Sequence, residues 1–231
     1  MKTVGIVGGI GPESTIAYYR LLVAMYREQK PDGSYPSLII NSIDMKKMLM
    51  LIEANDLSTL TKYLVSEVET LARAGAECGL LAANTPHIVF DEIQRRSPIP
   101  LLSIVQATCD AAKAQGLTKL GLFGTRFTMQ GRFYADVFAR EGMTLVVPGE
   151  DDQAYIHDKY MNELLHGIIR PETCARLLAI VEQLKRREHI QGLILGGTEL
   201  PLILRDGSSA GIPFLDTTEI HARALVARLL S

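Results

Sequence analysis

The sequence predicts an α/β protein of two similar lobes, each a parallel sheet flanked by helices. Short apolar, β-branched runs alternate with longer segments of helical periodicity, a pattern typical of strands buried between helices on both faces of a sheet. The runs form two sets, and members of the first set recur in the second in the same order and at nearly constant spacing. This ordered recurrence favours a duplication, with the two lobes related by a pseudo-twofold axis.

The strand candidates define where each lobe lies in the chain. The first set is Thr3–Gly8, Ser37–Asp44, Gly79–Asn84 and Leu101–Val105, and the second is Lys119–Gly124, Thr144–Val147, Gly192–Gly197 and Pro213–Asp216. The segments VGIVGG, GLL and PLLS of the first set correspond to LGLFGT, GLI and PFLD of the second. We expect a first lobe over residues 1–117, joined by the C-terminal helix, and a second lobe over residues 118–231.

Amphipathic segments separate these strands. Asp56–Ala74 carries apolar residues at steps of three and four, which predicts a helix with one buried face. Pro171–His189 opens with Pro-Glu-Thr, a favourable helix start, and Thr218–Leu230 is expected to form a terminal helix.

The composition excludes several classes of protein. The formal net charge is -2 and no basic block is present, which argues against a nucleic-acid partner. No apolar run approaches the roughly 18 residues of a membrane helix, and no signal-peptide pattern opens the chain. We therefore expect a soluble, cytoplasmic protein with no membrane partner.

The three cysteines indicate neither a metal site nor a disulfide framework. They are far apart and form no CxxC pair. The residues are Cys78, Cys109 and Cys174.

Polar loops follow four of the expected strands, two in each lobe. They read GGIGPEST at residues 8–15, AANTPH at 82–87, GTRFTM at 124–129 and GGTEL at 196–200. Ligands of open parallel sheets bind outside the carboxyl ends of the strands, so the four loops together predict an interlobe cleft. Each loop taken alone is equally consistent with a tight turn or a helix cap.

Several residues in and near these loops are candidates for holding a small carboxylate. Backbone N–H groups at a helix start favour anions, and hydroxyl or amide side chains can hydrogen-bond them. Two lysines could meet a distal carboxylate, although an exposed helical lysine is the simpler interpretation. The candidate binding residues are Ile10, Gly11, Lys47, Asn84, Thr85, Thr125, Thr128, Lys159 and Thr198.

The four loops and the closing Asp216-Thr217 resemble the aspartate/glutamate racemase family over nearly the whole chain. The resemblance implies an isomerase that uses no cofactor and no metal, binds an acidic amino acid between its lobes, and forms a homodimer. In that family one cysteine thiolate removes the α-proton from one face of the substrate, and a second thiol delivers a proton to the opposite face.

The positions that match those two cysteines are Ala83, just before Asn-Thr, and Gly197, just before Thr-Glu. Neither side chain can give or take a proton. We therefore expect two-thiol racemisation to be impaired or absent. If the site geometry is kept, cysteine at both positions is expected to restore some α-proton exchange.

Other groups could supply acid–base chemistry at the site. Glu199 is the first candidate and His87 the second. The simpler interpretations are a carboxylate complementing a helix N-terminus for Glu199, and a partly buried polar residue for His87. The native thiols are poor substitutes, because Cys78 lies about 16 Å before Ala83 along an extended strand and the other two fall in helical segments.

Four interpretations follow from these residues. The chain is a racemase that works through unfamiliar groups, or a non-racemising binder or regulator of a small molecule. A third interpretation is a lyase or isomerase that uses Glu199, His87 or Lys159 on a related carboxylate. The fourth is a chain from which the two cysteines were removed deliberately.

Overall fold

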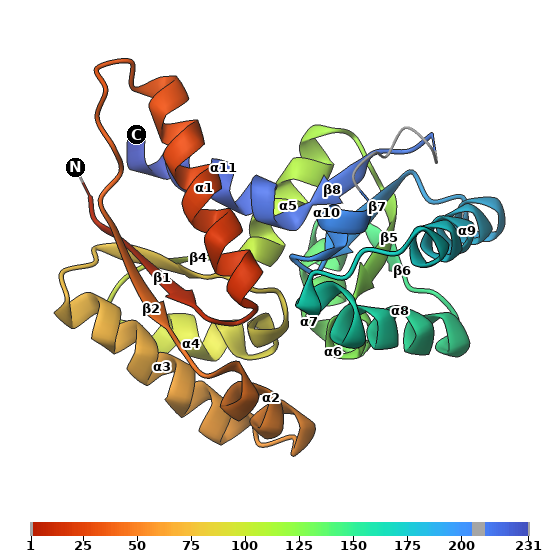
Figure 1. Ribbon diagram of the computed structural model, residues 1–231, viewed down its shortest axis with the longest axis horizontal. Coiled ribbons are helices and arrows are strands. Elements are labelled where there is room, and N and C mark those ends of the chain that lie inside the picture. The colour runs from red at the N-terminus through yellow and green to blue at the C-terminus, as the bar shows by residue number, and fades with distance from the viewer. Residues whose placement is uncertain (1, 205–210, 231) are drawn as a thin grey trace. The chain divides into compact units, whose positions relative to one another are not determined.

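The fold is described from a computed structural model that covers residues 2–204 and 211–230. The chain divides into two compact units (Figure 1). Unit 1 comprises Met1–Ile104 and His221–Ser231, and unit 2 comprises Val105–Ile220. Among the described helices, none combines the length and the hydropathy needed to cross a lipid bilayer.

Unit 1 is built on a parallel sheet. Its strands are β1 (Val4–Gly8), β2 (Leu38–Ser42), β3 (Cys78–Leu81) and β4 (Leu101–Leu102), in the order β2-β1-β3-β4. Residues Val4 of β1, Leu38 of β2 and Cys78 of β3 are in register. The carboxyl ends of β1 and β3 therefore lie side by side, which brings the loops that follow them together.

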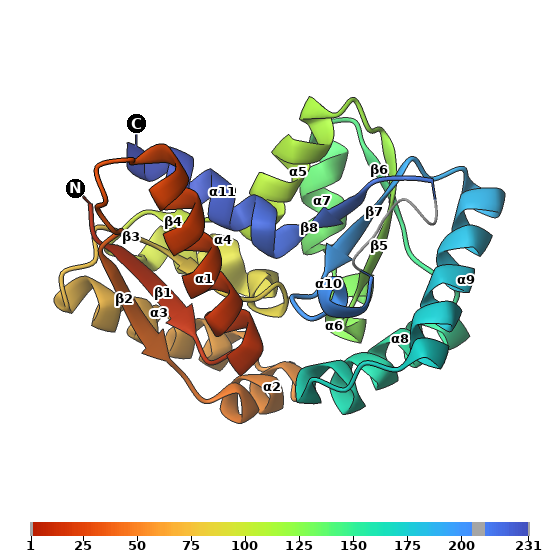
Figure 2. The same ribbon diagram turned by 45° about the horizontal axis from the view of Figure 1, so that its top comes forward.

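Helices cover both faces of the unit 1 sheet (Figure 2). They are α1 (Pro12–Gln29), α2 (Met45–Glu53), α3 (Leu57–Arg73), the 3₁₀ helix η1 (Thr85–Val89), α4 (Phe90–Arg96) and α11 (Thr217–Leu230). One face of β1 packs with Leu22 of α1 and Leu225 of α11 in a single apolar cluster. The opposite face meets α3, where a methyl group added to Gly5 would lie 3.0 Å from Leu71.

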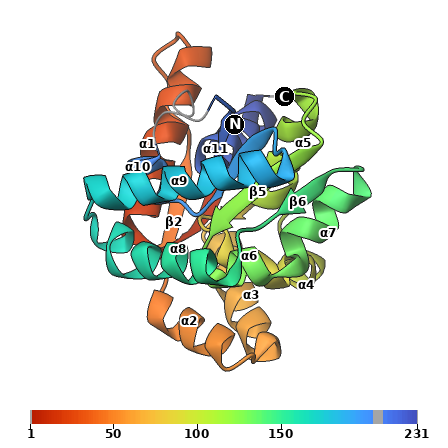
Figure 3. The ribbon, with the colours of Figure 1, turned by 90° about the vertical axis from the view of Figure 1, so that its right-hand side faces the viewer.

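Unit 2 repeats this plan. Its parallel sheet comprises β5 (Lys119–Gly124), β6 (Thr144–Val146), β7 (Gly192–Gly196) and β8 (Phe214–Asp216), in the order β6-β5-β7-β8. Its helices are α5 (Ile104–Ala114), α6 (Arg126–Gln130), α7 (Arg132–Arg140), α8 (Glu150–Asn162), η2 (Leu164–His166), α9 (Pro171–Glu188) and α10 (Leu200–Ile203). Helices α8 and α9 lie over the same face of the sheet (Figure 3). Ile156 of α8 and Leu177 of α9 share an apolar cluster with Leu193 of β7.

The predicted α/β class with two parallel sheets is confirmed, and the two sheets have equivalent strand orders. Several predicted strands are too long, since Ser37–Asp44 ends as a strand at Ser42 and Gly79–Asn84 ends at Leu81. Leu101–Val105 ends as a strand at Leu102, and Ile104 already begins α5. An apolar run of this length does not by itself distinguish a buried strand from the first turn of a buried helix.

The division between the units falls just after Ile104, the first residue of α5, whereas the boundary expected from the sequence was residue 117. Packing explains the difference, because Thr108 of α5 hydrogen-bonds the fully buried Tyr134 of unit 2. At the other end, the buried Leu225 and Val226 of α11 belong to the core of unit 1.

Candidate functional site

In unit 1, the loop after β1 turns sharply into α1. Gly9 has φ 78°, and a side chain there would collide with the backbone of Ile43, so only glycine fits this turn. Gly11 has φ 90° and precedes Pro12, the first residue of α1. The loop places Ile10 and Gly11, two of the predicted binding residues, at a helix N-terminus.

A buried serine joins this loop to the end of β3. The Ser14 hydroxyl donates to the carbonyl oxygen of Ala82 at 2.5 Å, and Ser14 is 1% exposed. The turn that holds Ala83 is thereby fixed to the first turn of α1. Asn84 and Thr85 follow Ala83 and are both buried, so four predicted binding residues from two loops lie along one sheet edge.

His87 is held by hydrogen bonds at both ring nitrogens. Its Nδ1 lies 3.0 Å from the carbonyl oxygen of Ala83, and its Nε2 accepts from the backbone N–H of Ile104 at 3.2 Å. The ring also stacks on Phe90, with centroids 4.7 Å apart. Because Nε2 accepts, Nδ1 carries the proton and donates to Ala83, which fixes one neutral tautomer.

A second buried histidine lies next to His87. His221 of α11 lies 2.8 Å from the Tyr18 hydroxyl through Nδ1 and 3.0 Å from the carbonyl oxygen of Leu102 through Nε2. Burial lowers the pKa of His87 to about 3 and that of His221 to about 4. Both rings are therefore neutral near pH 7. Because both nitrogens of His87 bond the backbone, at Ala83 and Ile104, its role is to hold these two segments together.

In unit 2, the loops after β5 and β7 lie at neighbouring strand ends, because Gly124 and Gly196 are in register. Thr125 begins α6, where its hydroxyl accepts from the Thr128 N–H at 3.3 Å and lies 3.2 Å from the Thr128 hydroxyl. Thr128 has no exposed surface. These two predicted binding residues form the first turn of α6.

Gly197 follows the last residue of β7 and faces an aromatic ring. The three atoms nearest to an ideal Cβ at Gly197 all belong to Tyr160, at 2.4, 3.0 and 3.1 Å. The Tyr160 ring therefore occupies the space of a side chain at position 197.

The Tyr160 hydroxyl is bonded to Glu199. It donates to Glu199 Oε2, and the Thr198 hydroxyl donates to the same oxygen at 2.7 Å. Burial, followed by the nearby Glu199 carboxylate, raises the pKa of Tyr160 well above its usual value. This corner of the site therefore combines a protonated phenol with a carboxyl group that is 1% exposed.

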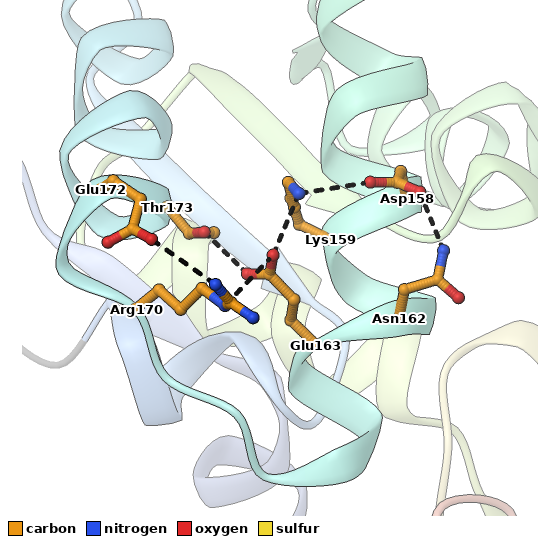
Figure 4. A network of polar contacts seen from close by, with 7 residues as sticks. All are labelled: Asp158, Lys159, Asn162, Glu163, Arg170, Glu172 and Thr173. Atoms are coloured by element: carbon orange, nitrogen blue, oxygen red, sulfur yellow. Dashed lines mark hydrogen bonds and ion pairs between the residues drawn. The ribbon is translucent and has the colours of Figure 1, made fainter.

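The two predicted lysines already have partners. Lys159 of α8 lies 2.9 Å from Glu163 Oε1, and Glu163 Oε2 accepts from the Thr173 hydroxyl at 2.7 Å (Figure 4). Lys47 is exposed in α2, with its ammonium 4.0 Å from the centroid of the Tyr63 ring. Neither geometry requires a ligand.

The native cysteines do not provide the missing thiols. Cys78 and Cys109 are buried within β3 and α5. Burial raises the pKa of Cys78 and raises that of Cys109 to about 11. Cys174 of α9 donates its thiol proton to the Ile203 carbonyl at 3.3 Å. Among the described residues, no group of three His, Cys, Asp or Glu side chains could hold a metal ion.

Sequence reasoning missed Tyr160 and His221. A signal for Tyr160 exists, because Ile156 and Tyr160 are four residues apart on the buried face of α8. No such signal exists for His221, whose bonds to Tyr18 and Leu102 join residues 203 and 119 positions apart in the sequence.

Two parallel sheets of equivalent strand order, with polar loops at their carboxyl ends, define a two-unit α/β protein. The sequence matches the Asp/Glu/hydantoin racemase family model over residues 7–225, and the chain belongs to that family.

Several relatives resemble this chain along its full length. It is 24% identical to the broad-specificity amino-acid racemase RacX of Bacillus subtilis over 99% of this chain and 98% of RacX. A crystal structure of PH1733, an aspartate racemase homologue from Pyrococcus horikoshii, has a TM-score of 0.86 at 35% identity with complete coverage of both chains. A Yersinia pestis structure, provisionally assigned as an Asp/Glu racemase, has a TM-score of 0.92 at 33% identity, again over both whole chains. Family membership supports an amino-acid racemase-like function.

Proposed function

We propose that this chain binds an acidic amino acid or a related small carboxylate and does not carry out two-thiol racemisation. One observation carries the second half of the proposal. The two family cysteine positions hold the methyl group of Ala83 and the hydrogen of Gly197, and a tyrosine ring fills the space over Gly197. Inversion at an α-carbon needs a base on one face and an acid on the other, and neither position supplies one.

The binding half of the proposal rests on the groups at the strand ends. The Ile10–Gly11 turn leads into α1, whose N-terminus favours an anion. Asn84 and Thr85 add amide and hydroxyl groups from the loop that follows β3 in the same unit. We assign a supporting part to Thr125, Thr128, Thr198, Lys47 and Lys159, whose side chains make contacts within the protein.

The remaining parts of the proposal come from the family. We propose a cofactor-independent, metal-free protein that forms a homodimer in the cytoplasm. Size-exclusion chromatography with light scattering measures the assembly directly.

Two measurements on the unaltered protein test the function. Titration calorimetry with aspartate, glutamate and simple dicarboxylates at millimolar concentration is expected to give heat from at least one of them. Proton NMR of aspartate and glutamate in deuterated water is expected to show an unchanged α-proton signal and unchanged configuration. Absence of heat from every ligand would refute the binding half, and loss of the α-proton signal would refute the catalytic half.

A second candidate function follows from the Tyr160–Glu199 pair. A protonated phenol beside a carboxyl group can move one proton, as a lyase or an isomerase acting on a related carboxylate requires. Of the three substitute groups considered, Glu199 is the one bonded to a protonated phenol, so we assign the acid–base role to it. If turnover of any carboxylate is found, Glu199→Gln is expected to abolish it, whereas the same change at Glu28, which is exposed on α1, is expected to leave it unchanged.

A further inference from the structure

The space over Gly197 is closed by one side chain and not by the main chain. The φ angle of Gly197 lies outside the left-handed region, so its backbone accepts an L-residue. At the preceding Gly196 the situation differs, because a Cβ there would lie 2.8 Å from the backbone oxygen of Phe123. Position 196 is thus closed by the sheet itself, whereas position 197 is closed by Tyr160.

Tyr160 has little freedom to move away. It is 6% exposed and packs in the unit 2 core with Ile156 and Leu200. Its hydroxyl is bonded to Glu199 at the far end of the ring. A clash with the end of a flexible side chain costs little, because that side chain can move away. The Tyr160 ring cannot move easily, because it is packed in the core and its hydroxyl is hydrogen-bonded. Swinging the ring away from position 197 would break its hydrogen bond to a buried carboxyl group.

We infer that Tyr160 determines which side chains fit at position 197. The absence of a thiol there therefore depends on two residues, Gly197 itself and Tyr160. A cysteine at 197 alone has no room for its Cβ, and it is accommodated once the Tyr160 ring is removed. This corrects the expectation that cysteines at 83 and 197 suffice to restore exchange. The inference deepens the proposed function. Its statement about α-proton exchange rests on that proposal, whereas its statement about the space at position 197 does not.

A double-mutant cycle on unfolding tests the steric relationship without any ligand. Gly197→Ala adds only the Cβ and is expected to lower the Tm by roughly 2–10 °C, the range for overpacking in a chain of this size. In a Tyr160→Ala background the same change is expected to cost nothing measurable. Tyr160→Phe is the matched control, because it removes the hydroxyl and keeps the ring, so Gly197→Ala should remain costly there.

The outcomes of this cycle decide the inference. Equal Tm losses from Gly197→Ala in all three backgrounds would overturn it, as would full tolerance of Gly197→Ala in the presence of Tyr160. If a variant is too unstable to measure by heat, urea unfolding of the Tyr160→Ala and Tyr160→Ala/Gly197→Ala proteins provides the same comparison. Loss of stability on adding the methyl group in that background would also overturn the inference.

A second readout addresses the chemistry. Ala83→Cys/Gly197→Cys is expected to leave the α-proton of aspartate unexchanged in deuterated water, whereas adding Tyr160→Ala is expected to permit exchange. Faster exchange by the double variant than by the triple variant would overturn the inference. If neither variant exchanges and calorimetry shows no ligand, the proposed function fails, while the unfolding cycle still decides the role of Tyr160.

Discussion

The hydroxyl of Tyr18 lies 2.8 Å from Nδ1 of His221, which links helix α1 to helix α11 across 203 positions of sequence. Because the other nitrogen of His221 bonds the Leu102 carbonyl, Nδ1 is the acceptor and the tyrosine donates. The bond is fully buried, and it ties the last helix of the chain to the first within unit 1.

Removing this donor should destabilise the protein. Tyr18→Phe keeps the ring but leaves the buried His221 nitrogen without its donor, so we expect a loss of about 1–3 kcal/mol in the free energy of unfolding. Urea denaturation at pH 7 measures it. Tyr19→Phe is the control, because Tyr19 is 50% exposed and should change stability little. Equal effects of the two substitutions would contradict the assigned bond.

The two buried histidines should make the protein acid-sensitive. Their folded pKa values, about 3 for His87 and about 4 for His221, lie below the ordinary 6.5 of the unfolded chain. Between these values the unfolded state binds more protons, so stability falls as the pH is lowered below 6.5. We expect a slope approaching about 1.4 kcal/mol per pH unit for each histidine.

Urea unfolding at intervals from pH 7 to pH 5 measures this slope, over a range in which few carboxylates titrate. His221→Gln is expected to reduce the slope, whereas substituting the exposed His166 with Gln should leave it unchanged. Stability that stays flat down to pH 5 would show that the two rings are protonated within the fold.

The buried thiols should be unreactive in the native protein. Burial raises the pKa of Cys78 and Cys109, and the thiolate is the reactive form. We expect iodoacetamide at pH 8 to leave both unmodified in the folded protein and to modify both in urea. Peptide mass spectrometry measures each site, and Cys174, which is partly exposed, is the internal comparison. Rapid native labelling of Cys109 would contradict the burial described.

The Glu163 network should contribute to the start of α9. Thr173→Val removes a hydroxyl that donates to the Glu163 carboxylate within a buried contact, and a loss of about 1.5–3 kcal/mol is expected. Thr70→Val is the control, since the Thr70 hydroxyl bonds the Ser66 carbonyl on an exposed helix face. Thermal unfolding compares the two, and a larger loss from Thr70→Val would refute the assignment.

Much of the fold could be predicted because its causes are local. Strand Lys119–Gly124 is observed with the bounds expected from its apolar run, and Pro171–Glu188 begins at the predicted proline. Ala83 follows β3 and Gly197 follows β7, and the order of these two strands along the chain likewise follows from the apolar runs. In each case residues adjacent in sequence carry the signal.

The rest of the site depends on contacts between distant segments. Nothing near Gly197 in sequence indicates that Tyr160 covers it, because Tyr160 lies in α8, which is separated from Gly197 along the chain by α9 and β7. His87 could be predicted as partly buried, but its tautomer depends on the backbone of Ile104, which follows β4. Lys159 is a plausible ligand for a carboxylate until Glu163 is found beside it.

The order of the units along the chain has a consequence for biosynthesis. Unit 2 is one continuous segment of the chain, so its strands and helices leave the ribosome one after another. Unit 1 is completed only when residues 221–231 have been made. At usual elongation rates the delay is on the order of ten seconds. Throughout it, the apolar surface that receives Leu225 and Val226 stays uncovered on the nascent chain. Residues 1–104 are therefore expected to be a substrate for ribosome-associated chaperones, and unit 2 is expected to complete its fold first although it is made second.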